Sequence, residues 1–86
     1  MKIYKFPVGE GVVTLPLWSD SQIVNFCEDP TGTLCLWATV FPEEGRPDLR
    51  AQRRFQIVGT GHDFPRDAII RGSTKCGPFM WHLIEL

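Results

Sequence analysis

The chain has 86 residues, enough for one small domain with a single modest core. Hydrophobic residues make up 43% and charged residues 22%, a balance typical of a globular rather than a disordered protein. Nine basic and ten acidic residues give a formal charge of −1, which excludes a whole-molecule field attracting nucleic acid or membrane. No apolar leader or long apolar run is present, so we expect a soluble, unexported protein without membrane contact.

Seven prolines and eight glycines cut the chain into short segments, and none has helical periodicity over a dozen residues. These segments are typical of strands. In chain order, we expect strands over residues 2–8, 12–18, 22–28, 33–41, 49–59, 69–75 and 79–86. Pro16 limits its segment to an edge strand or a bulge. Residues 64–67 add at most one short helical turn, because Pro65 suits the start of a helix.

The segment from Asp29 to Gly32 predicts a hairpin turn between the third and fourth strands. It reads DPTG, with proline where a type I turn needs a φ near −65° and glycine where a left-handed residue follows. A bulge at Gly32 sets the register of the two strands. Cys27 then falls directly opposite Cys35 on one face of the sheet.

The chain has three cysteines, an odd number without CxxC spacing: Cys27, Cys35 and Cys76. This usage is typical of a reducing compartment, where cysteine serves as a small buried hydrophobe. The facing pair can be a packed reduced pair, half of a metal site completed by Cys76, His62 or His82, or a redox-sensitive bridge. We expect the reduced pair, with no metal and no cofactor.

The domain organisation follows from these segments. Residues 1–86 form one domain, and the segment 42–50, rich in proline and acidic residues, is expected to be an exposed mobile loop. The strands at 34–41 and 79–86 are apolar on both faces, which places each of them inside a two-layer structure or at an interface. We therefore expect an all-β, mainly antiparallel sandwich or small barrel of six to seven strands, with a homodimer as one way to bury the surplus apolar surface.

Three motifs resemble a family of small tailed-bacteriophage proteins with no established activity. The motifs are CLWA (Cys35, Leu36, Trp37 and Ala38), F-x-I-x-GTGH (Phe55, Ile57, Gly59, Thr60, Gly61 and His62) and PF-x-WH (Pro78, Phe79, Trp81 and His82). The resemblance covers most of the chain, and the stretch 43–53 is longer than in that family. It implies a phage origin and, because such small proteins often act on host machinery, a host target.

The GTGH segment has two interpretations. Its backbone N–H groups, with the Thr60 hydroxyl and the histidine rings, can hold a phosphate or carboxylate. Its two glycines can equally form a tight corner after a strand. The anion-binding candidates are Gly59, Thr60, Gly61, His62 and His82.

Four arginines within nine positions, beside three tryptophans elsewhere, mark candidate contact residues. The partner-binding candidates are Arg46, Arg50, Arg53, Arg54, Trp37 and Trp81. Arginine and tryptophan can contact a phosphate backbone and stack on bases, but three acidic neighbours cancel much of the local field, so nucleic acid is the less favoured partner. Tryptophan is also enriched in protein interfaces and in small cores.

We therefore expect a non-enzymatic phage accessory protein that binds a host protein in the host cytoplasm and inhibits a host defence. The alternative is a small-ligand protein that holds a phosphorylated nucleotide or signal at the 59–62 turn. No Ser or Cys nucleophile has an adjacent base in the sequence, so no catalytic residue is assigned. An enzyme built on His62 and His82 would need both rings at a common point.

Overall fold

A computed structural model describes residues 1–41 and 50–86 of the chain, and within them it is all-β, as predicted. The seven strands are β1 (Lys2–Pro7), β2 (Val12–Trp18), β3 (Ile23–Glu28), β4 (Leu34–Val40), β5 (Arg50–Gly59), β6 (Ile69–Cys76) and β7 (Phe79–Glu85). No helix occurs in these two ranges. The predicted helical turn is a single hydrogen-bonded turn, in which the Ala68 N–H donates to the Pro65 carbonyl at 3.1 Å.

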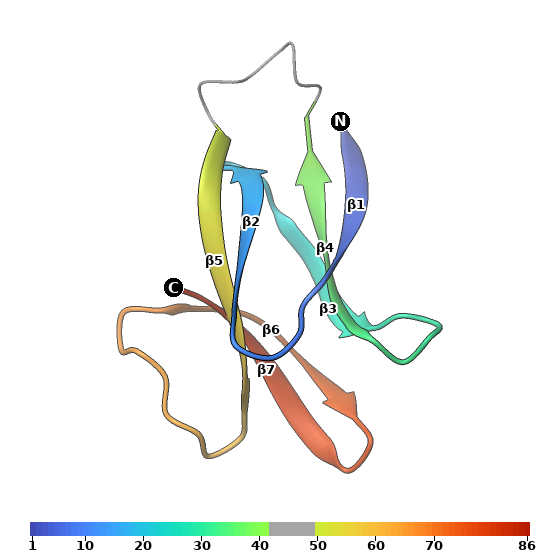
Figure 1. The fold of residues 1–86 in the computed structure, drawn as a ribbon, viewed down its shortest axis with the longest axis vertical. Coiled ribbons are helices and arrows are strands. Elements are labelled where there is room, and N and C mark those ends of the chain that lie inside the picture. Colours follow the sequence, from blue (N-terminus) through green and yellow to red (C-terminus); the bar gives the residue numbers. More distant parts are fainter. Residues whose placement is uncertain (42–49) are drawn as a thin grey trace.

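The strands form two antiparallel sheets (Figure 1). Sheet A has the order β1-β4-β3, and sheet B has the order β2-β5-β7-β6. The two sheets stay separate, so the molecule is a two-layer sandwich and not a closed barrel. They approach closely where β3 meets β6: a Cβ built on Gly72 would lie 3.4 Å from the Cβ of Phe26.

The core lies between the two sheets. Its largest fully buried side chains facing this space are Leu17, Leu36, Phe55 and Leu83. Each such side chain contributes about 1.5–3 kcal/mol when it leaves water. The prediction for the two-sided strands is confirmed: β4 is the central strand of sheet A and β7 is an inner strand of sheet B. On the outer face of β4, Cys35 and Thr39 are buried as well.

The DPTG hairpin has the predicted register. Gly32 has a φ of +86°, its N–H donates to the Asp29 carbonyl at 2.9 Å, and Cys27 pairs with Cys35. Pro16 lies on β2, an edge strand of sheet B, as its sequence position required.

Residues 42–49 of the predicted loop at 42–50 lie outside the described residues. Arg50, the last residue of that range, is the first residue of β5 and pairs with Trp18 of β2. No helix in the described ranges is long and apolar enough to span a membrane.

Candidate functional site

The GTGH segment forms a tight turn at the end of β5. The His62 N–H donates to the Gly59 carbonyl at 3.1 Å, and Gly61 has a φ of +90°, the combination expected of a type II turn. A Cβ built on Gly59 would lie 3.2 Å from His62 ring atoms and 3.3 Å from Trp81 Cζ3. A side chain at this position would be crowded by the imidazole and the indole, so both rings would have to shift by a few tenths of an ångström to admit it.

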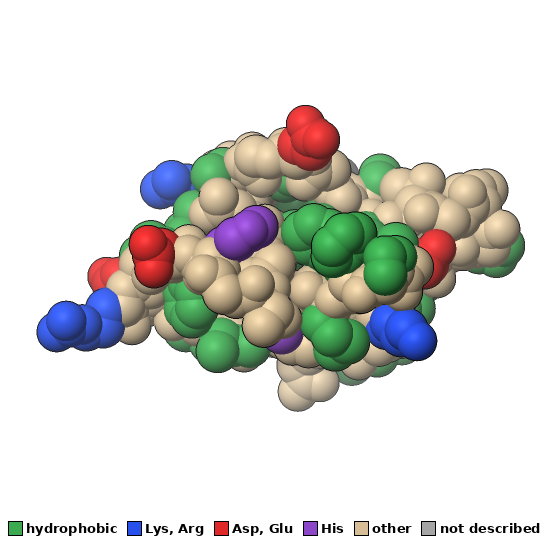
Figure 2. Space-filling model, turned by 90° about the horizontal axis from the view of Figure 1, so that it is seen from below, with side chains coloured by type: hydrophobic (Ala, Val, Ile, Leu, Met, Phe, Trp, Pro, Cys, Tyr) green, Lys and Arg blue, Asp and Glu red, His purple; other side chains and the backbone are tan. Residues whose placement is uncertain are grey.

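The GTGH and WH motifs therefore meet in space. Gly59 pairs with Trp81 across β5 and β7, and Val58 pairs with His82. Neighbouring residues of a strand point to opposite faces, so Trp81 lies on the core side and His82 on the outer face. The His62 ring lies on the side of Trp81, because atoms of both rings lie within 3.3 Å of a Cβ built on Gly59. Figure 2 shows the histidine side chains as separate patches at this end of the molecule. This geometry gives the two rings no common point, so it does not support an enzyme that uses both of them.

His82 is held by two hydroxyl groups on the outer face of sheet B. Its Nδ1 lies 2.6 Å from Ser73 Oγ and its Nε2 lies 2.8 Å from Thr60 Oγ1. A neutral imidazole has one donor and one acceptor nitrogen, so one hydroxyl donates to the ring and the other accepts from it. The arrangement fixes the ring orientation, but among the described residues no carboxylate completes a nucleophile–base–acid relay.

Sequence reasoning missed Ser73. A signal was present in the turn at 77–78, since a two-residue hairpin loop with glycine first fixes the register of the strands beside it. Gly77 has a φ of +62°, and the pairs run from Cys76 with Phe79 back to Ser73 with His82. Counting outward from the turn gives the same partner for His82.

Two of the predicted anion-binding donors make internal contacts. The His62 N–H donates to the Gly59 carbonyl, and the Thr60 hydroxyl shares a hydrogen bond with His82. The segment has the geometry of a tight glycine corner after a strand, which the sequence offered as the alternative to an anion site. A phosphate at this turn stays a prediction.

A second polar cluster surrounds Arg53. Its Nε and Nη2 donate to the two carboxylate oxygens of Glu85 at 2.7 and 2.8 Å, and its Nη1 donates to the carbonyls of Trp18 and Ser21 at 3.0 and 2.7 Å. Arg71 Nε donates to the same Glu85 at 2.9 Å. Burial alone would raise the pKa of Glu85, but the hydrogen bonds from the two arginines outweigh it and hold the pKa below its ordinary value. We name these three charged residues the Arg53 clamp.

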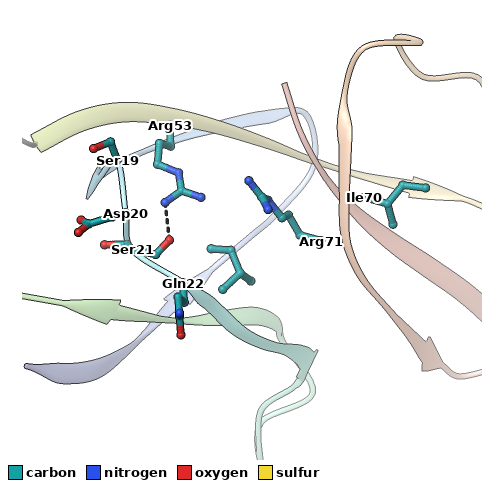
Figure 3. Close-up of a pocket in the computed structure, with 8 residues that line it drawn as sticks. Ser19, Asp20, Ser21, Gln22, Arg53, Ile70 and Arg71 are labelled. Carbon is teal, nitrogen blue, oxygen red and sulfur yellow. Dashed lines mark hydrogen bonds between the residues drawn. The ribbon is translucent and has the colours of Figure 1, made fainter.

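An open pocket of about 520 Å³ lies beside the clamp (Figure 3). Residues from the β2–β3 turn line one side and residues from β6 line the other, with Arg53 from β5 between the turn and Arg71. The lining residues are Ser19, Asp20, Ser21, Gln22, Ile23, Arg53, Ile70 and Arg71. Glu85 accepts from both arginines, so its one negative charge offsets one of their two positive charges before any ligand enters.

The structure does not bring the predicted partner-binding residues together. Arg53 is buried and its guanidinium is used inside the protein, whereas Arg54, the next residue, is exposed on the opposite face. Trp37 is half-buried on the outer face of sheet A, and Trp81 is half-buried on the core side of sheet B. Arg46 lies outside the described residues, and of Arg50 only the strand position is described.

The three cysteines are free thiols. Burial, and then the negative charge of Asp29, raises the pKa of Cys35. Burial, and then a hydrogen bond with Glu28, raises the pKa of Cys76. In residues 1–41 and 50–86 no three His, Cys, Asp or Glu side chains gather where they could hold a metal ion.

These features define a small all-β sandwich domain. It has the GTGH turn beside Trp81 at one end and a polar pocket beside the Arg53 clamp. The chain belongs to the family described as Domain of unknown function (DUF7352), which matches residues 1–86. Neither a curated protein nor a solved structure matches the chain.

Proposed function

We propose that this protein is a non-enzymatic phage accessory protein that binds a host protein in the host cytoplasm and inhibits a host defence. The observation that carries the proposal is the exposed apolar tip of the β6–β7 hairpin. Phe79 is 61% exposed and Met80 44% exposed, on opposite faces of β7. The Phe79 ring lies 5.9 Å from the half-buried Trp81 ring, at 51° to it. We name Phe79, Met80 and Trp81 the tip patch.

Hydrophobic side chains gather beside a histidine when the molecule is seen from the end that carries this hairpin (Figure 2). Aromatic residues and methionine are enriched at the centres of protein interfaces, where a few anchors supply most of the binding free energy. The two-residue loop at Gly77 keeps the strands paired up to Cys76 and Phe79, so the tip residues lie on a regular hairpin.

The position of the hydroxyl–imidazole cluster of Ser73, His82 and Thr60 supports the non-enzymatic part of the proposal. Ser73 and His82 lie on the outer strand surface and Thr60 lies in the turn after β5, and none of the three lines the pocket of about 520 Å³. A nucleophile and base normally work in a cleft that excludes water and orients the substrate.

The test is affinity capture from a bacterial lysate with the wild-type protein and the double variant Phe79→Ala/Met80→Ala, followed by binding measurements with the purified captured protein. We expect the double variant to raise the Kd by about tenfold or more, since each anchor contributes more than about 1 kcal/mol. Val12→Ala is the matched control, because Val12 is also an exposed apolar side chain but lies on a different strand, β2. Equal affinities for the wild type and the double variant would exclude the tip patch as the contact surface.

A further inference from the structure

The open edge of β1 differs from the other three sheet edges. An edge strand exposes unpaired N–H and C=O groups, and proteins usually protect it with proline, a bulge or a charge. β2 carries Pro16, β3 is irregular between Ile23 and Asn25, and β6 is irregular between Ile70 and Gly72. β1 pairs with β4 without a break from Lys2 to Pro7, and its one proline is the last residue of the strand, so the edge from Lys2 to Phe6 contains neither a proline nor a bulge. The open side of these residues is therefore a regular strand edge.

The direction of each backbone group on β1 follows from one hydrogen bond. The Val8 N–H donates to the Leu34 carbonyl at 3.0 Å, on the same register line as the pairs of β1 with β4. Backbone groups of an antiparallel strand alternate in direction, so residues 2, 4 and 6 also bond toward β4. Ile3 and Lys5 then direct their N–H and C=O groups outward, and no hydrogen bond among the described residues uses them.

The side chains of β1 leave this edge accessible. Ile3 is 56% exposed and Tyr4 is 50% exposed, on opposite faces of the strand. Lys5 is the charge expected to repel another strand, but its Nζ lies 2.9 Å from Asp29 Oδ2, which neutralises it. The edge thus combines regular backbone groups, exposed apolar side chains and a compensated charge.

We infer that β1 pairs with β1 of a second copy of this chain, in an antiparallel arrangement with its two-fold axis at Tyr4. Ile3 then faces Lys5 of the partner subunit, and the two symmetric pairs make four backbone hydrogen bonds. Tyr4 faces the partner subunit's Tyr4 in a pair without backbone hydrogen bonds, where side chains approach most closely. Sheet A becomes one continuous six-stranded sheet. This inference does not rest on the proposed function.

Other registers are less complementary. An axis at Lys5 would place two lysines directly opposite each other and would set Ile3 against Pro7, which has no N–H to donate. An axis at Ile3 would depend on Met1, which lies outside β1 and is 77% exposed. The register centred on Tyr4 uses every outward donor of the strand and places no like charges opposite each other.

The test combines sedimentation velocity over a micromolar to submillimolar range with two variants. Ile3→Pro removes an outward N–H without removing a bond to β4, and it should raise the dimer Kd by about tenfold or more because two hydrogen bonds are lost per dimer. Ile3→Ala, which keeps the N–H, is its control and should have the smaller effect. Circular dichroism checks that both variants fold.

Tyr4→Cys tests the register directly, and it still reports if the proline variant fails to fold. Residues that face each other in a pair without backbone hydrogen bonds lie within reach of a disulfide, so we expect oxidation to give a covalent dimer that the wild type does not form. Lys2→Cys, two residues away on the same face, should cross-link much less. A wild-type protein that stays monomeric throughout, or a Tyr4→Cys variant without the covalent dimer, would overturn the inference. Because the tip patch is not part of this edge, Phe79→Ala/Met80→Ala should leave the dimer unchanged.

Discussion

Each sheet carries one carboxylate that accepts several hydrogen bonds, and the two carboxylates organise the molecule at different scales. In sheet B, Glu85 joins Arg53 and Arg71, and through Arg53 it holds the β2–β3 turn, so it fixes strands far apart in sequence. In sheet A, Asp29 accepts at one oxygen from the Thr31 and Thr33 N–H groups at 2.9 and 3.1 Å and from the Thr31 hydroxyl at 2.6 Å. Those bonds lie within a single turn.

The difference shows where each carboxylate acts. The Arg53–Glu85 pair of the clamp is largely buried, with exposed fractions of 9% and 12% for the two side chains, whereas Arg71 is 33% exposed. An unpaired charge left in such a place is costly. The Asp29 turn organises its own hairpin, and its ion pair with Lys5 involves a well-exposed ammonium group. The clamp should therefore control global stability, whereas the turn should control the local order of one hairpin.

The largest effect is expected for Arg53→Met. This change leaves Glu85 with only Arg71, and leaves the Trp18 and Ser21 carbonyls without their guanidinium donor, so the free energy of unfolding should fall by about 3–5 kcal/mol. Urea denaturation measures the loss. Arg54→Met is the matched control, because Arg54 is exposed on the opposite face of β5, and it should change stability by no more than about 0.5 kcal/mol. Equal effects of the two variants would contradict the assignment of Arg53 as a clamp.

The same comparison explains what the sequence could predict. Local turn residues located the strands to within one or two positions, and the DPTG segment gave the register of β3 and β4. Both depend on short-range backbone preferences that a few residues determine. The order β2-β5-β7-β6 and the ion pair between residues 53 and 85 depend on strands far apart in the chain, for which no local residue preference exists.

Arg53 is a candidate partner-binding residue that the structure places in the interior. In the sequence it belongs to a basic group with Arg50 and Arg54, which suggested an exposed contact surface. Strand alternation carried the correct signal, because Arg53 and Phe55 lie two residues apart and must share a face. The aromatic residue marked that face as the core side, and the guanidinium over the Phe55 ring at 5.7 Å confirms it.

The second prediction concerns how the free energy of unfolding depends on pH through these two carboxylates. Hydrogen bonds from the Thr31 hydroxyl and from Lys5 hold the pKa of Asp29 well below its ordinary value, and the pKa of Glu85 is also lowered. A carboxyl with a lowered folded-state pKa stabilises the protein above its unfolded-state pKa, and this stabilisation is lost as the pH falls through the folded-state pKa. The free energy of unfolding should therefore decrease as the pH is lowered from about 5 toward 2.

Glu85→Gln and Asp29→Asn should each flatten this acid limb, measured as unfolding free energy against pH. Arg54→Met removes an exposed charge that is not among the hydrogen-bond partners of either carboxylate in the described residues. The pH dependence of its unfolding free energy should therefore match that of the wild type. If neither carboxylate variant altered the limb, other groups would have to account for the acid sensitivity.

Asp29→Asn should have a smaller and more local effect at neutral pH. The amide oxygen can still accept from the turn N–H groups, but the charge that strengthens these bonds and the ion pair with Lys5 are lost. Hydrogen exchange should become faster at Thr31 and Thr33, while the exchange of Phe55 and Leu83 in the core of sheet B should keep its wild-type rate. Faster exchange in both sheets would mean that the turn contributes to global stability as the clamp does.

The smallest effect is expected for Lys5→Met. The lysine ammonium is well exposed, and exposed ion pairs contribute little because water and salt screen them and both side chains lose freedom. The free energy of unfolding should be nearly unchanged and should depend no more on salt than that of the wild type, as urea denaturation at low and high ionic strength would show. The dimer, by contrast, should become tighter, because an apolar side chain replaces the Lys5 charge on the open edge of β1 while the backbone groups are kept. A variant with unchanged stability and a tighter dimer would separate the role of Asp29 within its own hairpin from the role of Lys5 at the edge of the sheet.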